Sequence, residues 1–245
     1  MSIYQKVISF ALMLALGPVV AAAQEQHFDV EFGYEDGGIE FESNGLGFDA
    51  NGIFETEFEV TNMDGSQVAE DPGFASNFTK GDEAFSVTSG DSIFLNVNQS
   101  QTFGTYLTYF NADTNSFEST DALFNIQDNS PAGTTDLIIS ESGLSGDLSQ
   151  FVVTSTGFEI DTHVDFVLSS GAAEGAYGLL LNIESDNLSG DLTNTTSDRF
   201  WVLFNNGLSE ESFESAVDNF SAVPEPSAVG ILALAFAGVL RRNRK

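Results

Sequence analysis

The chain has 245 residues, no cysteine, and a formal net charge of −30 from 37 acidic and 7 basic side chains. So acidic a chain repels nucleic acid and anionic lipid surfaces, which excludes both as partners of the folded part. Without cysteine there are no disulfides, so stability must come from the apolar core or from a bound metal. With 42% hydrophobic residues and 23 Phe, the composition predicts a folded protein rather than a disordered one.

The first 23 residues have the layout of a secretory signal peptide. Lys6 precedes an apolar run that begins at Val7, Gly17-Pro18 interrupts the run, and small residues lead up to Ala23. We expect signal peptidase to cut between Ala23 and Gln24, and we therefore expect an exported protein. A retained membrane helix is disfavoured because the apolar run is short.

The body of the chain, residues 24–221, is predicted to be one mainly β domain. Apolar and polar residues alternate with a period of two, as in residues 27–34, where His27, Asp29 and Glu31 share the polar face. Turn-forming residues recur about every ten positions, which is typical of an antiparallel β-sandwich or a jelly roll. One short helix is predicted to end the domain.

Strands are predicted at 27–34, 39–41, 53–60, 84–87, 92–97, 102–110, 122–126, 137–140, 151–154, 163–168, 176–183 and 200–205. Residues 62–78 contain the turn signal Asp71-Pro72-Gly73 and are predicted as a long loop. The helix is predicted at 210–220, because its apolar residues fall on one side, Ser209 can cap it, and two Glu occupy its first turn.

The last stretch, residues 222–245, has three parts in a fixed order. Pro224-Glu225-Pro226 cannot continue a strand or a helix, because proline fixes φ and lacks an amide donor. An uncharged apolar run follows at 227–240, and the chain then closes with Arg241, Arg242, Arg244 and Lys245. As a helix the apolar run is roughly 21 Å long at ~1.5 Å per residue, short against a hydrocarbon core of ~30 Å.

This order of parts resembles the PEP-CTERM sorting signal of Gram-negative bacteria. The resemblance implies that an exosortase-type enzyme removes the tail and leaves the body at the cell surface, at the outer membrane or in the extracellular matrix. The membrane would be contacted only by the C-terminal helix before processing. An ordinary single-pass anchor is the alternative, but it needs no Pro-Glu-Pro and is usually longer. Between the two signals the cations are Lys80 and Arg199, whereas all but one of the acids remain.

The two histidines of the chain occur in the same short pattern. His27 precedes Asp29 by two positions, His163 precedes Asp165 by two, and Asp161 extends the second set. Residues i and i+2 of a strand share a face about 6.6–6.8 Å apart, so each pair presents an imidazole beside a carboxylate. If the two strands are neighbours, these side chains converge into a set suited to Zn²⁺. Coincidence is the alternative in so acidic a chain, with surface contacts of little energy.

Calcium is the weaker metal alternative, and no catalytic motif is present. Residues 111–115 and 186–191 offer Asp and Asn oxygens, but neither stretch has the spacing of an EF-hand loop. The sequence has no Cys nucleophile, no G-x-S-x-G and no H-E-x-x-H, so we do not expect an enzyme. Leu-Ser-Gly-Asp-Leu occurs twice, at 144–148 and 188–192, which favours a reused turn over a repeat architecture.

The body also resembles a family of PEP-CTERM proteins under the zinc-uptake repressor Zur. The stretches that carry the resemblance are QHFDVEFGYEDGGIEF at 26–41, residues 52–60 with EDPGF at 70–74, DTHVDFVL at 161–168, residues 175–184, and SDRFWVLFNNGLSEESFESAV at 197–217. Members of that family often have a second His at the position of Asp161. The resemblance implies a link to zinc limitation and favours a zinc site formed by His27, Asp29, Asp161, His163 and Asp165.

Two other functions stay open. A structural protein of a biofilm or exopolysaccharide matrix would bind polysaccharide and divalent cations loosely, without a discrete site. A carbohydrate-binding jelly roll would need an exposed aromatic platform, for which the lone Trp201 is the candidate. Trp201 lies in a continuous apolar stretch, however, which favours packing in the core.

Overall fold

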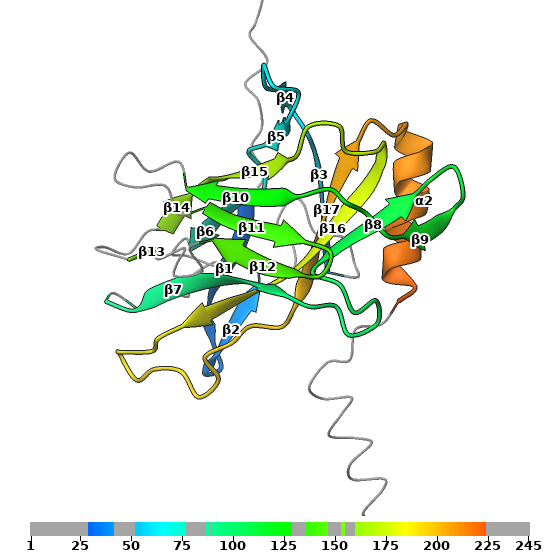
Figure 1. Ribbon diagram of the computed structural model, residues 1–245. Helices are drawn as coiled ribbons and strands as arrows, with labels where there is room; N and C mark the ends of the chain where they lie inside the picture. Colours follow the sequence, from blue (N-terminus) through cyan, green and yellow to red (C-terminus); the bar gives the residue numbers. More distant parts are fainter. Residues whose placement is uncertain are drawn as a thin grey trace, which may run out of the picture.

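The computed structural model describes residues 29–41, 52–76, 87–88, 90–128, 136–146, 153–154 and 160–223. This part is mainly β and contains one helix, α2 (Glu210–Ser221), which confirms the predicted fold class (Figure 1). His27 and most of the predicted strand at 84–87 lie outside the described residues, and so do the predicted processing residues: Ala23, Gln24, Pro224, Glu225, Pro226, Arg241 and Arg242.

The strands form three sheets around a shared core. The β16 sheet has the order β13 (Val153–Thr154), β7 (Ser92–Asn98), β16 (Gly175–Ser185), β17 (Phe200–Asn206) and β3 (Ile53–Glu57). Beside one end of β16 it also holds β8 (Leu107–Asn111), which pairs with β9 (Ser116–Glu118). The β10 sheet has the order β12 (Gly143–Gly146), β11 (Asp136–Ser140), β10 (Phe124–Asp128), β15 (Val164–Leu168), β5 (Gln67–Ala69) and β4 (Val60–Thr61). The β6 sheet has the order β14 (Ile160–Thr162), β6 (Gly73–Ser76), β1 (Asp29–Glu35) and β2 (Gly38–Phe41).

The predicted long loop at 62–78 is wrong, because β5 and β6 lie there. Both strands have buried side chains, among them Ala69 and Phe74. Pro72 has no amide donor and interrupts them, so the turn signal divides two strands instead of marking a loop. His163 is the one residue between β14 and β15. β14 pairs antiparallel with β6, and β15 pairs antiparallel with β5. The β6 and β10 sheets are therefore joined at His163 and at residues 70–72.

Most strand pairs are antiparallel, as predicted, but β1 pairs with β6 and β3 pairs with β17 in parallel. Side chains of all three sheets fill the main core, including Val30, Phe74, Phe124, Phe166 and Phe204. The ring centroids of Phe124 and Phe204 lie 4.7 Å apart, and those of Phe166 and Phe204 lie 5.0 Å apart. Phe side chains thus fill the centre of a protein that lacks disulfides.

Helix α2 covers the other face of the β16 sheet. Ser209 caps it, accepting a hydrogen bond from the Ser212 amide at 3.3 Å, as predicted. The helix buries its apolar side against Trp201, whose exposed fraction is 7%, so Trp201 offers no platform for a sugar. Gly178 of β16 leaves room for the Phe220 ring of the helix, because a Cβ at position 178 would lie 2.6 Å from Cε1 of Phe220. No helix within the described residues is long and apolar enough to cross a membrane.

Replacing Phe220 by Ala should lower the free energy of unfolding by about 3–5 kcal/mol, because it empties a buried site at the end of α2. The ring is 1% exposed and lies 5.1 Å from Trp201 and 5.0 Å from Phe117, between centroids. Urea unfolding measures the change. Glu214→Ala, at an exposed position of the same helix, is the control and should shift stability by only about 0.5 kcal/mol. Similar losses for both variants would show that α2 is not anchored by Phe220.

Candidate metal site

Three strands of the β6 sheet place Asp29, Gly73 and His163 in one row. The parallel pairing of β1 with β6 sets Asp29 opposite Gly73. The antiparallel pairing of β14 with β6 sets Thr162 opposite Phe74, so the next residue, His163, arrives beside Gly73. Successive side chains of a strand point to opposite faces of the sheet, so these positions decide on which face each side chain lies. Val30 and Phe74 point into the core, and Asp29 and His163 lie on the outer face.

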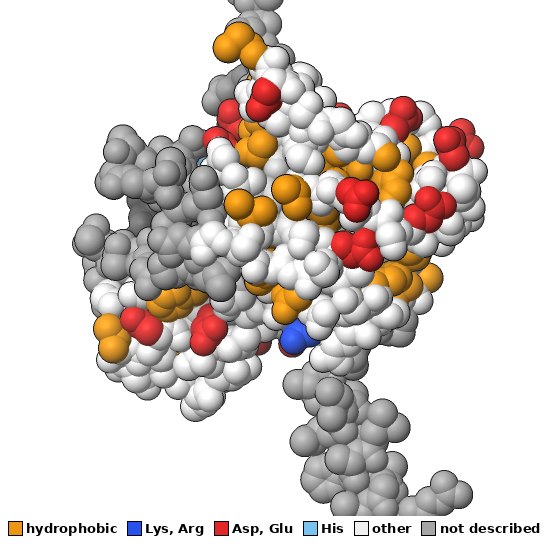
Figure 2. Space-filling view, in the orientation of Figure 1, with side chains coloured by type: hydrophobic (Ala, Val, Ile, Leu, Met, Phe, Trp, Pro, Cys, Tyr) orange, Lys and Arg blue, Asp and Glu red, His pale blue; other side chains and the backbone are white. Residues whose placement is uncertain are grey.

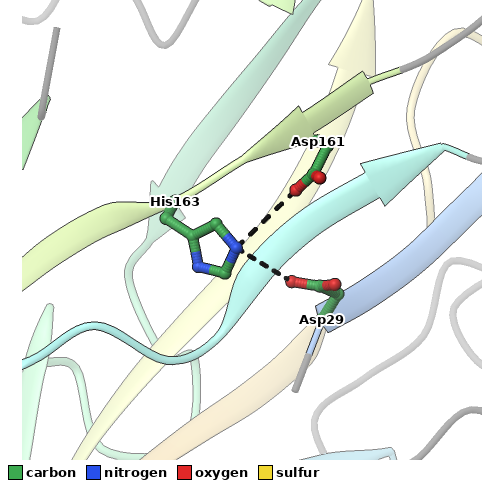
Figure 3. A network of polar contacts seen from close by, with 3 residues as sticks. All are labelled: Asp29, Asp161 and His163. Atoms are coloured by element: carbon green, nitrogen blue, oxygen red, sulfur yellow. Dashed lines mark ion pairs between the residues drawn. The ribbon is translucent and has the colours of Figure 1, made fainter. Parts of the chain in front are cut away.

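One edge of the His163 imidazole faces two carboxylates, those of Asp29 and Asp161 (Figure 3). Its Nε2 atom is 3.6 Å from Oδ1 of Asp29 and 3.6 Å from Oδ1 of Asp161. Both contacts are longer than a hydrogen bond. The side chains of Asp29, His163 and Asp161 are 29%, 34% and 70% exposed, so the site opens to solvent on the side of Asp161. The Oδ1 atom of Asp29, by contrast, is buried.

Gly73 allows Asp29 and His163 to meet across the middle strand. A Cβ at position 73 would lie 2.7 Å from Cε1 and 2.9 Å from Nδ1 of His163, and it would also overlap Oδ1 of Asp29. Real Cβ atoms do not approach other atoms so closely, so any other residue would push the two side chains apart. The absence of a side chain on β6 is therefore a condition of the site.

Two distances among the three side chains are close to those between ligands of one zinc ion. One ligand atom from each of Asp29, Asp161 and His163 lies within 4.8 Å of the others, and no other group of three His, Asp or Glu in the described ranges does so. Two ligand atoms at ~2.0–2.1 Å from a tetrahedral zinc ion are roughly 3.4 Å apart, close to the 3.6 Å observed. A neutral imidazole with two carboxylates carries two negative charges, which a divalent ion balances. Three protein ligands leave one position open.

Three of the five predicted residues, Asp29, Asp161 and His163, lie close together in the described part of the chain. The strands of Asp29 and His163 are not neighbours, because β6 lies between them. Asp161 rather than Asp165 lies close to His163. Asp165 comes after His163 on β15, where it lies opposite Gln127 of β10. His27 lies outside the described residues. Gly73 was missed because Asp71-Pro72-Gly73 predicts a turn, although an isolated strand glycine often marks a close approach.

In the two stretches considered for calcium, polar side chains hold the loops in place. Oδ1 of Asn111 accepts a hydrogen bond from the amide of Asp113 at 3.0 Å. Thr114 and Asn111 donate to Glu118, which follows the 111–115 turn, and these hydrogen bonds hold the pKa of Glu118 below its ordinary value. The amide of Ser92 likewise lowers the pKa of Asp186, and Asp191 accepts a hydrogen bond from Thr88. These oxygens serve loops, and neither stretch supplies a cluster of three ligands among the described residues.

Comparison with known proteins identifies the end of the chain. A family model described as the PEP-CTERM protein-sorting motif matches residues 222–245. The motif implies an exported protein, directed to the cell surface and processed by an exosortase-type enzyme. The match begins at Ala222, the residue that caps α2 at its C-terminal end, so the sorting motif directly follows the folded domain. No curated protein and no solved structure matches the chain, and the resemblance of its body to the Zur-controlled family stays a prediction.

Gly73→Ala should lower the free energy of unfolding by about 1–3 kcal/mol, the usual cost of overpacking, because the new methyl group meets Asp29 and His163. Urea unfolding without metal measures this. Gly143→Ala is the matched control, since a Cβ at this strand glycine would have nothing within 4 Å. If both variants unfold at the same urea concentration, Gly73 does not control the packing of the site.

Proposed function

We propose that the exported protein binds a zinc ion at its surface through Asp29, Asp161 and His163. The spacing of their three ligand atoms, within 4.8 Å of one another, is the observation that carries the proposal. An imidazole nitrogen with two carboxylate oxygens is a ligand set that zinc accepts, and the fourth position is left for water or another ligand. Calcium is the weaker candidate because it takes oxygen ligands, and one of the three ligand atoms here is an imidazole nitrogen.

Two further residues belong to the proposal in lesser roles. His27 stands two positions before Asp29, and the strand predicted at 27–34 would put both on one face, so His27 is a candidate fourth ligand. Asp165 lies two positions after His163 and contributes negative charge near the site.

The setting of the site favours capture of metal from outside the cell. The motif at 222–245 implies export and direction to the surface, and the site itself is partly exposed. Together with the resemblance to Zur-controlled proteins, this supports a role under zinc limitation, on the outer membrane or in the extracellular matrix of a Gram-negative cell. Strong negative charge raises the concentration of divalent cations near the protein.

A structural role in a biofilm or exopolysaccharide matrix is the second candidate, and the charge is the observation that favours it. Acidic side chains are scattered over the face shown in Figure 2, with a single small basic patch. Such a protein would bind Ca²⁺ or Mg²⁺ weakly at many places. Replacing a histidine would then have no effect on metal binding.

Isothermal titration of the purified protein with Zn²⁺ tests the two candidates. We expect one site tighter than 1 mM, which corresponds to about 4 kcal/mol. His163→Ala should weaken binding at least tenfold, because it removes the only nitrogen of the three ligands. Binding should also weaken as pH is lowered, since protons compete with the metal for the imidazole.

Glu40→Gln is the matched control for the titration. Glu40 is exposed on β2 and lies opposite Gly33 of β1, on the same face of the sheet as Asp29. Its replacement should leave zinc affinity within twofold. His27→Ala measures whether His27 adds a fourth ligand. Binding no tighter than 1 mM, or equal loss in the Glu40 and His163 variants, would contradict a discrete site.

A further inference from the structure

We propose that the metal at this site clamps the beginning of β1 onto β6, so that zinc controls how firmly the first described strand is held; this inference rests on the proposed zinc site. Asp29 supplies the ligand from β1. Asp161 and His163 supply the ligands from the other side of β6. A metal bound to all three therefore joins the strands that flank β6.

The other end of β1 is fastened without the site. The hydroxyl of Tyr34 donates to Oδ2 of Asp91 at 2.9 Å and lies 2.6 Å from the hydroxyl of Ser185. In the turn after β1, the carbonyl of Gly37 accepts hydrogen bonds from the amides of Thr193 and Asn194, at 2.8 and 3.0 Å. The Tyr34 contacts tie the end of β1 to the residue before β7 and to the last residue of β16. The Gly37 contacts tie the β1–β2 turn to the segment between β16 and β17. All of them lie at the other end of the strand from Asp29.

The beginning of β1 is held to β6 by a short parallel ladder. Its register pairs are Asp29 with Gly73, Val30 with Phe74, and Glu31 with Ala75. Parallel pairs are slightly less stable per residue than antiparallel ones. An end of a strand with so short a ladder opens locally more readily than the centre of a sheet. A metal bond to Asp29 must break when this end opens, so the metal opposes the opening.

The size of the effect follows from mass action. If the open form loses the metal, the opening equilibrium falls by a factor of about 100 when free zinc is 100 times its dissociation constant. Any zinc that stays on Asp161 and His163 in the open form reduces this factor. In a chain with no cysteine, the metal would act as the cross-link that a disulfide provides elsewhere.

Hydrogen exchange of backbone amides, read by mass spectrometry on the purified protein with and without ZnCl₂, tests the clamp. Zinc should slow exchange in peptides covering 29–33 and 73–76, by up to about 100-fold at the ratio given above. Peptides covering the β1–β2 turn and α2 serve as internal references and should change by less than twofold. Zinc binding is measured by titration on the same samples, because the expected slowing depends on the ratio of free zinc to its dissociation constant.

Two variants separate the clamp from simple binding. Asp29→Asn and Asp161→Asn each remove one carboxylate, and both are compared at equal saturation with zinc. Asp161→Asn should keep the zinc-dependent protection of 29–33, because β1 is still bonded to the metal, whereas Asp29→Asn should lose it. Zinc binding with unchanged exchange at 29–33, or equal protection in both variants, would overturn the clamp and leave the zinc site standing. No zinc binding at all would overturn both.

Discussion

Asp29 and His163 approach each other across the backbone of β6, and they do so because residue 73 is glycine. The register on either side of β6 places both residues beside Gly73, and a Cβ there would fall within 3 Å of the imidazole. The order of the sheet, with β6 between β1 and β14, brings the two side chains over this position. The close approach of Asp29 and His163 therefore depends on the missing side chain at residue 73.

The sequence predicted much of the framework because period-two alternation and helix caps are local properties. The strand around Asp29, the apolar stretches of β16 and β17, and the helix capped by Ser209 all appear where expected. β5 and β6 were missed because they are only three and four residues long and flank Pro72, so turn chemistry outweighs their apolar residues. Pairing is not a local property. Nothing in the spacing of His163 and Asp29 indicates a strand between them, or favours Asp161 over Asp165.

Export and the lack of cysteine both bear on how the fold is stabilised. A cysteine-free domain outside the cell depends on its core, and the clustered rings of Phe124, Phe166 and Phe204 supply it. Helix α2 closes the outer face of the β16 sheet, and the sorting motif begins at its cap. The last described helix therefore ends where the sorting motif begins. Dense surface acids keep the protein hydrated. In the proposed site, the imidazole of His163 would favour zinc over cations that take only oxygen ligands.

Anomalous diffraction at the zinc edge, from crystals grown with Zn²⁺, tests the account most directly, because it locates the metal without assuming its ligands. We expect one strong peak about 2.0–2.2 Å from Nε2 of His163 and from a carboxylate oxygen of both Asp29 and Asp161. The peak should be absent in crystals of His163→Ala grown in the same way. Zinc spread over many weak surface peaks, with none at His163, would contradict a discrete metal site.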